Sequence, residues 1–222
     1  MRAEVCVVGG GPAGLMLALL LARQGRRVVV LEKHGDFLRD FRGDTVHPST
    51  LDVLDELGLF DRLAALPHRR VSTLRVTFAD RTVPMADFGR LAVKHPYIAF
   101  LPQWHFLELL AGAAASCPGF TLLRSHPVVD VLRVDGRVEG VVAQRPDGSR
   151  VEVRAPLTVA ADGRHSTVRE RVGLRPREYG APMDVLWLRV SRTADDPAGL
   201  DMRVGPGRLM IGIDRGDYWQ LG

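Results

Sequence analysis

Short apolar strands and an apolar helix alternate along the first part of the chain. The pattern predicts a strand from Glu4 to Val8, a helix from Pro12 to Gln24, and a second buried strand from Arg27 to Leu31. Proline suits the first turn of a helix, and Gly25 suits its end. Two strands joined by one helix of this length pair in parallel through a right-handed crossover. The chain therefore begins with a predicted βαβ unit.

The rest of the chain mixes helices with a larger share of β structure. Its patterns predict helices at Ser49 to Leu57, Gln103 to Ser116 and His165 to Val172, a hairpin at 72–78 and 82–85, and strands over Thr121 to Ala161 and beyond Pro182. Asp-Gly pairs mark turns inside the long β region. We expect an α/β fold whose parallel unit is followed by β-rich segments.

The stretch from Val5 to Ala22 is uncharged and long enough for the shortest membrane spans, which need about 17 residues. However, three glycines and Pro12 interrupt it and would break a spanning helix. A strand then follows at Arg26 to Glu32, which no signal peptide would supply. We therefore expect neither a membrane span nor a signal peptide.

The composition is that of a folded globular protein, with 222 residues, 46% hydrophobic and 25% charged. The chain is basic, with a net charge of +4 and a pI of about 9.6. Its arginines are scattered and form neither a long run nor an RNA-binding aromatic motif. We expect no nucleic-acid partner.

Two cysteines, Cys6 and Cys117, are too few for a disulfide framework or a metal site. The seven histidines are too dispersed for metal-ligand spacing. We therefore expect no metal and a location in the reducing cytoplasm.

The segment Gly9-Gly10-Gly11-Pro12-Ala13-Gly14 fits the pattern G-x-G-x-x-G between a strand and a helix. In such a turn the first glycine permits the tight bend, the second lets a pyrophosphate approach, and the third lets helix and strand pack closely. The anion then lies at the helix N-terminus, where free N–H groups favour negative charge. The predicted cofactor contacts here are Gly9, Gly11, Pro12, Ala13 and Gly14.

Glu32, at the end of the second strand, is the predicted ribose contact, with Lys33 beside it. Its carboxylate can accept hydrogen bonds from an adenosine ribose and would repel a 2′-phosphate. This turn therefore indicates FAD or NAD and argues against NADP. The alternative is a glycine-rich turn beside a surface glutamate.

A second motif lies at Leu157 to Arg169, where a strand of small residues leads into a tight turn and a helix. It resembles the Asp-Gly motif of the group A flavoprotein aromatic hydroxylases, the p-hydroxybenzoate hydroxylase-like family. Asp162, Gly163, Ser166 and Arg169 match the positions of that motif. An ionised aspartate suits backbone N–H donors better than a phosphate, so we expect Asp162 to fix the loop. The alternative is an ordinary Asp-Gly turn followed by a helix capped by Ser166.

The resemblance implies FAD as the cofactor, with NADH or NADPH as the co-substrate meeting the same Asp-Gly loop. It further implies that Arg42 reaches the flavin pyrophosphate and that Gln103, at a helix start, hydrogen-bonds the flavin. Either residue could instead be a surface residue or a simple cap. His105 stands where many relatives carry an arginine, so that cofactor contact is not expected.

The implied architecture is a Rossmann-like FAD-binding domain formed by residues 1–71 and 97–181. A β-rich substrate domain would comprise residues 72–96 and 182–222. Apolar residues in its segments suit an apolar substrate, although core packing explains them equally well.

The resemblance implies a monooxygenase, in which NAD(P)H reduces FAD and one oxygen atom of O₂ reaches an aromatic or polyketide-like substrate. No catalytic acid or base is assigned. His47 lies in the loop expected to approach the flavin, yet a capping or exposed histidine fits the pattern better. Alternatives within the superfamily are a reductase, a dehydrogenase or a halogenase, although the Trp-x-Trp-x-Ile-Pro element of halogenases is absent.

The family's second fingerprint, a Gly-Asp pair in an apolar strand, has no counterpart in this sequence. Gly216-Asp217 precedes a polar strand and Gly43-Asp44 lies in an early loop, so neither pair matches. We expect the chain to be an N-terminal fragment or a truncated gene product. A truncated FAD-binding protein without activity is the remaining alternative.

Overall fold

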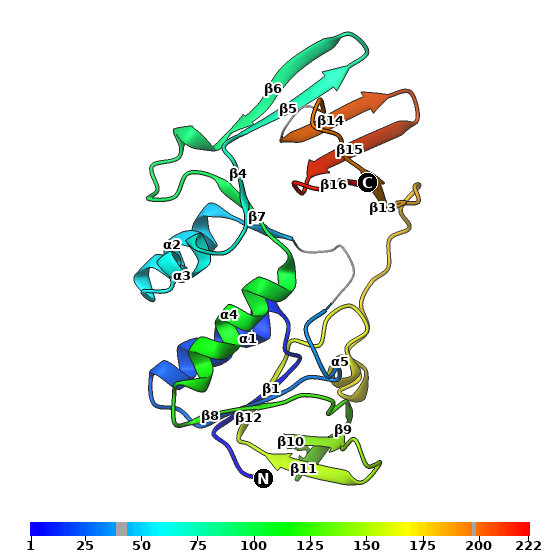
Figure 1. Ribbon diagram of the computed structural model, residues 1–222. Helices are drawn as coiled ribbons and strands as arrows, with labels where there is room; N and C mark the ends of the chain where they lie inside the picture. Colours follow the sequence, from blue (N-terminus) through cyan, green and yellow to red (C-terminus); the bar gives the residue numbers. More distant parts are fainter. Residues whose placement is uncertain (39–43, 197–198) are drawn as a thin grey trace. The chain divides into compact units, whose positions relative to one another are not determined.

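The computed structural model describes residues 1–38, 44–196 and 199–222, which form two compact units (Figure 1). Unit 1 comprises Met1–Leu38 and Trp104–Glu178, and unit 2 comprises Arg39–Gln103 and Tyr179–Gly222. These bounds divide the chain by packing alone. The functional division into an FAD-binding domain and a substrate domain stays a prediction.

Unit 1 is built on a four-stranded parallel sheet with the strand order β12-β1-β2-β8. Its strands are β1 (Val5–Val8), β2 (Val28–Leu31), β8 (Phe120–Leu123) and β12 (Leu157–Ala160). Every residue of β1 and β2 is buried, as expected for parallel strands covered on both faces. The predicted βαβ unit is confirmed, with each strand one residue shorter at its start.

Helices cover one face of this sheet. α1 (Pro12–Arg23) packs against β1, β2 and β8, and its buried stripe contains Leu15, Ala18, Leu19 and Ala22. α4 (Gln103–Ala115) lies on the same side as α1 (Figure 1). Both helices end within a residue of their predicted bounds, because their apolar periodicity is strong.

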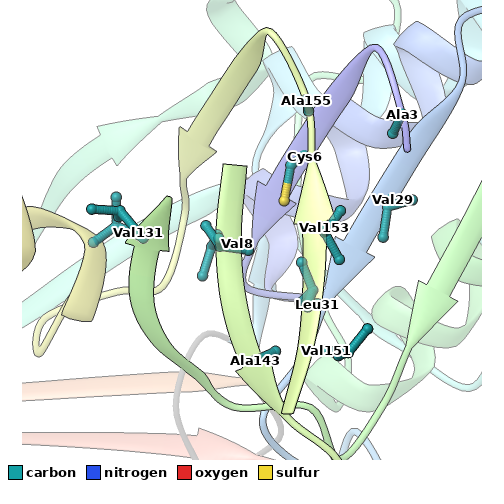
Figure 2. Packing of buried hydrophobic residues seen from close by; sticks show 12 residues of the cluster. Ala3, Cys6, Val8, Val29, Leu31, Val131, Ala143, Val151, Val153 and Ala155 are labelled. Carbon is teal, nitrogen blue, oxygen red and sulfur yellow. The ribbon is translucent and has the colours of Figure 1, made fainter. Parts of the chain in front are cut away.

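The other face of the parallel sheet packs against a three-stranded antiparallel sheet, β11-β10-β9. Its strands are β9 (Val128–Val134), β10 (Arg137–Gln144) and β11 (Arg150–Arg154). Figure 2 shows the core between the two sheets, where Cys6 and Val8 of β1 meet Val153 of β11. Because strand side chains alternate, Cys6 and Val8 share one face while Val7 lies against Gly14 on the helical face. Burying each valine stabilises the unit by about 1.5–3 kcal/mol.

A short helix completes unit 1. α5 (Thr167–Arg171) follows the Asp-Gly turn and packs against β9, with Val168 buried in the core. Ser166 caps it, since its hydroxyl accepts the N–H of Arg169 at 3.0 Å. This helix was expected over a slightly longer range.

The described part of unit 2 contains two sheets, two α-helices and one 3₁₀ turn. A three-stranded antiparallel sheet has the order β3-β7-β4, and a six-stranded sheet has the order β13-β16-β15-β14-β5-β6. Their strands are β3 (Thr45–Val46), β4 (Arg69–Val71), β5 (Thr73–Phe78), β6 (Arg81–Asp87), β7 (Ile98–Phe100), β13 (Leu188–Ser191), β14 (Leu200–Gly205), β15 (Arg208–Asp214) and β16 (Tyr218–Leu221). The helices are α2 (Pro48–Glu56), α3 (Phe60–Ala64) and the 3₁₀ turn η1 (Phe88–Arg90).

The expected hairpin and the β structure beyond Pro182 are confirmed as β5–β6 and β13–β16. The β14–β5 pair is parallel, whereas the other pairs of the six-stranded sheet are antiparallel. The expected α/β class with β-rich segments is confirmed. No helix among the described residues is both long and apolar enough to cross a bilayer.

Candidate cofactor site

The glycine turn after β1 is held tightly against the end of β12. Gly9 has φ +106°, a conformation that side-chain-bearing residues rarely adopt, and its N–H donates to the Leu31 carbonyl at 2.8 Å. A Cβ on Gly9 would overlap the Ala161 carbonyl group, and one on Gly14 would overlap the Gly9 carbonyl oxygen. Both positions therefore require glycine for close backbone packing.

The N-terminus of α1 opens from this turn without a cap from the chain itself. Gly11 is the N-cap residue, no side chain caps the helix, and the first turn carries no acidic residue. The Cβ position of Gly11 meets nothing within 4 Å, and Pro12 and Ala13 are exposed. A helix N-terminus with accessible N–H groups and open space favours an anion such as a pyrophosphate.

Glu32 is 6% exposed and holds the turn from the second strand. One carboxylate oxygen accepts the N–H of Gly10, and the other accepts the N–H of His34, both at 2.9 Å. The glutamate therefore ties the glycine turn to the segment after β2. Lys33 is exposed beside it.

The Asp-Gly turn lies directly against the glycine turn. The N–H of Ala161 donates to the Val8 carbonyl at 2.7 Å, which extends the β12–β1 pairing to the start of the turn. Asp162 Oδ2 accepts the N–H of Val168 at 3.2 Å, while Oδ1 is buried and has no partner among the described residues. Gly163 has φ +81°, a conformation that glycine adopts easily, and this lets the chain turn sharply after the strand.

The profile of the FAD binding domain family matches residues 2–202 of the chain. The chain belongs to this family. A relative named 6-methylpretetramide 4-monooxygenase, from Streptomyces rimosus, is 36% identical over 99% of this chain and 52% of its own length. The chain thus spans about half the length of this curated relative.

Solved structures agree with the family assignment. The p-nitrophenol 4-monooxygenase of Pseudomonas putida DLL-E4 has a TM-score of 0.81 at 25% identity, covering 99% of this chain and 57% of that one. A probable FAD-dependent monooxygenase from Pseudomonas aeruginosa has a TM-score of 0.83 at 23% identity, covering 100% and 60%. The family profile, the curated relative and the p-nitrophenol 4-monooxygenase structure confirm the resemblance to the group A FAD-dependent monooxygenases.

The geometry of unit 1 fits FAD. The open N-terminus of α1 can receive the pyrophosphate, and the orphaned Asp162 Oδ1 can accept a hydroxyl donor from the cofactor. Unit 1 thus brings together the turn residues Gly9 to Gly14, Glu32, Asp162 and Gly163, as the packing of Gly9 on Ala161 demonstrates.

The other residues that the sequence singled out are two predicted contacts, Gln103 and Arg42, and two histidines. Gln103 belongs to unit 2, and its N–H donates to Asp44 Oδ1 at 3.1 Å. Arg42 lies outside the described residues. His47 is exposed at the N-cap position of α2 without a side-chain capping bond, and His105 is half-buried on α4 beside Trp104.

Unit 2 contains a buried polar cluster that the sequence patterns did not indicate. Asp44, Arg215 and Gln220 converge there, although Asp44 and Arg215 are 171 positions apart. No spacing rule connects such distant residues, so only the tertiary structure reveals them.

A hollow of about 940 Å³ lies between the ends of the β5–β6 and β14–β15 hairpins of unit 2. It is lined mainly by apolar side chains, including Phe78, Val204, Leu209 and Met210, and by none of the predicted cofactor contacts. The helix N–H groups of α1 and a carboxylate oxygen without a partner among the described residues gather at the glycine turn instead. No cluster of metal-ligating side chains occurs in the described part of the chain.

Proposed function

We propose that the chain provides the FAD site of an NAD(P)H- and O₂-dependent monooxygenase that hydroxylates an aromatic or polyketide-like small molecule. The contact between the glycine turn and the Ala161–Asp162 strand end is the observation that supports it most. A glycine turn alone suits FAD or NAD, whereas its pairing with the Asp-Gly motif favours FAD. The similar proteins named as monooxygenases of 6-methylpretetramide and p-nitrophenol support the substrate class.

The pyrophosphate is proposed to bind at the start of α1. Gly11 offers open space to the anion, and the N–H groups of the first turn attract its charge. Gly9 and Gly14 shape the turn, while Pro12 and Ala13 begin the helix at the exposed surface. No side chain of this turn competes for the helix N–H groups.

Glu32 and Lys33 are proposed to meet the adenosine end. The Glu32 carboxylate is already oriented by two backbone N–H groups, and a carboxylate is a suitable acceptor for a ribose hydroxyl. Its negative charge disfavours a 2′-phosphate at that position, which agrees with FAD as the resident cofactor.

Asp162 and Gly163 are proposed to bind the flavin side of the cofactor. The Oδ1 atom of Asp162 is buried and has no hydrogen-bond partner in the described ranges of the chain, so a hydroxyl donor there would satisfy this acceptor. Gln103 is proposed as a hydrogen-bonding contact of the flavin and Arg42 as a pyrophosphate contact. Arginine suits the latter task because its fork donates two parallel hydrogen bonds to phosphate.

Bound FAD supplies the redox chemistry, which is hydride acceptance from NADH or NADPH and activation of O₂. The residues of this chain bind and orient the cofactor, and no side chain is assigned as an acid or base. The substrate is proposed to be a small molecule, with no nucleic-acid partner. The location is proposed to be the cytoplasm, which fits two free thiols at Cys6 and Cys117.

The full chain, loaded with FAD, would be assayed for NADH and NADPH oxidation with p-nitrophenol and with polycyclic phenols under isotopically labelled O₂. The proposal predicts substrate-dependent oxidation and a product that carries one labelled oxygen atom. Gly11→Ala should lower this rate, whereas the surface variant Gly180→Ala should not. NAD(P)H oxidation whose rate does not depend on the substrate, and which yields only hydrogen peroxide, would contradict hydroxylation and indicate a flavin reductase. A halogenated product in the presence of halide would indicate a halogenase.

A further inference from the structure

Unit 2 contains an ion pair that is almost fully removed from solvent. Arg215 Nη2 lies 2.5 Å from Asp44 Oδ2, and the two side chains are only 5% and 10% exposed. Asp44 directly precedes β3, and Arg215 directly follows β15, so the pair joins the two sheets of this unit. Breaking such a pair leaves a buried charge without a partner, which is far costlier than losing a surface ion pair.

Asp44 accepts hydrogen bonds from the segment that leads into α4. Its carbonyl accepts the N–H of Leu101 at 3.0 Å, and its Oδ1 accepts the N–H of Gln103 at 3.1 Å. Gln103 is the first residue of α4, so its N–H is one of the four that the helix itself cannot satisfy. Asp44 therefore caps α4 from a distant part of the chain and fixes the backbone of Gln103.

Arg215 favours the charged form of this cap. Burial raises the pKa of the Asp44 carboxyl, while the Arg215 guanidinium and the Gln103 N–H oppose that rise. Arg215 is held in turn by Gln220, whose Oε1 accepts from Nε at 2.9 Å and from Nη2 at 2.6 Å. Gln220 is 2% exposed, so the arginine has little freedom to move away.

We propose that Arg215 is a positioning residue for Gln103, because it holds Asp44, which in turn holds the backbone of Gln103. The inference rests on the proposed function in one respect, which is the role of Gln103 as a flavin contact. Arg215 itself is not proposed to touch the cofactor. Its removal should loosen Gln103 first and weaken FAD binding as a consequence.

The test uses the FAD-free full chain and compares Arg215→Met with the control Arg203→Met. Arg203 also pairs with an aspartate of unit 2, Asp201 at 2.7 Å, but its side chain is 62% exposed. Hydrogen exchange of the Leu101 and Gln103 amides is the readout, because exchange reports local opening directly. We expect exchange of the Gln103 amide to accelerate at least about tenfold in Arg215→Met. A change of this size corresponds to the loss of roughly one buried charged hydrogen bond. Arg203→Met should leave it unchanged.

Arg215→Lys is a second variant, which keeps the positive charge but loses the planar guanidinium group with its several N–H donors. We expect intermediate protection of the Gln103 amide, since a lysine can pair with Asp44 yet cannot also bind Gln220 in the same geometry. Protection of Gln103 equal to the unaltered chain in both variants would overturn the inference. Acceleration of the same size in Arg203→Met would also overturn it, because the effect would then not be specific to Arg215.

FAD titration, followed by flavin fluorescence, separates the two proposals. The inference predicts a weaker affinity for Arg215→Met than for Arg203→Met. If the unaltered chain does not bind FAD, the proposed function fails, while the exchange data still decide whether Arg215 positions Gln103. If both variants bind FAD with the affinity of the unaltered chain, the link from Arg215 to the cofactor is wrong.

Discussion

Gly9 packs its α-carbon directly against the carbonyl group of Ala161, leaving no room for a side chain between them. Gly9 belongs to the turn after β1, and Ala161 follows the last residue of β12. The two cofactor motifs are about 150 positions apart in sequence and meet here because β1 and β12 pair in parallel, with Val8 opposite Ala160. Each motif therefore sets the backbone position of the other.

Gly9→Ala should destabilise unit 1 by about 2–4 kcal/mol, since it adds a strained positive φ to a backbone clash. Urea unfolding followed by circular dichroism would measure the change. Gly180→Ala is the matched control, because its Cβ position meets nothing within 4 Å. Equal stability of the two variants would contradict the contact between Gly9 and Ala161.

Gly11→Ala should separate binding from folding. Its Cβ would project into open space, and its backbone at φ −78° is accessible to alanine, so we expect a loss of stability within about 1 kcal/mol. FAD affinity should nevertheless fall at least about tenfold, because the methyl group occupies the space of the pyrophosphate. Equilibrium titration with FAD, beside thermal melts, would test this. Unchanged FAD affinity would show that the pyrophosphate binds elsewhere.

Glu32→Gln should weaken both the turn and cofactor binding. The carboxylate accepts N–H groups from Gly10 and His34, whereas an amide offers one acceptor oxygen and directs its NH₂ at the other donor. We expect a loss of about 1–3 kcal/mol in the free energy of unfolding and a higher dissociation constant for FAD. The exposed Glu56→Gln is the control for charge removal alone. A variant as stable as this control would argue against the two backbone hydrogen bonds.

The two thiols should differ sharply in reactivity. Burial raises the pKa of the Cys6 thiol to about 12, whereas Cys117 is half-buried after α4. At a pH of about 8.5, a disulfide reagent should modify Cys117 in the folded chain and reach Cys6 only after unfolding. Rapid modification of both thiols in the folded chain would show that the core around Cys6 opens easily.

The same shift in the pKa of Cys6 has a consequence for stability. The folded pKa is higher than the unfolded value, so the contribution of Cys6 to stability is complete below about pH 8.5. It is lost as the pH rises towards 12, because only the unfolded thiol then ionises readily. Urea unfolding between neutral and alkaline pH would measure this decline in stability. In Cys6→Ser, the part of the decline that is due to the Cys6 thiol should be absent.

The sequence predicts the βαβ unit well because its signals are local. Pro12 begins α1, Gly25 follows it, and continuous apolar runs mark β1 and β2. By contrast, α3 has only five residues and no side-chain cap, and β3 has only two residues, so neither leaves a periodic signal. Such short elements depend on tertiary packing rather than on their own sequence.

The candidate site also has a part that the sequence predicts and a part that it does not. The glycines are predictable from local backbone geometry, Glu32 from its place at the end of β2, and the Asp-Gly turn from the family resemblance. The support of Gln103 by Asp44 and Arg215 is not predictable, because the partners come from distant elements that pair only in the folded chain. Arg42 remains a prediction from the resemblance alone.

The most direct test of the central claim is the visible spectrum of the purified chain after incubation with FAD and gel filtration. If the glycine turn and the Asp-Gly turn form a cofactor site, an absorption band near about 450 nm, shifted from that of free flavin, should elute with the protein. The Gly11→Ala chain should elute with less of this band, and the Gly180→Ala chain with as much as the unaltered one. A folded but colourless chain would contradict the claim that these residues bind FAD by themselves.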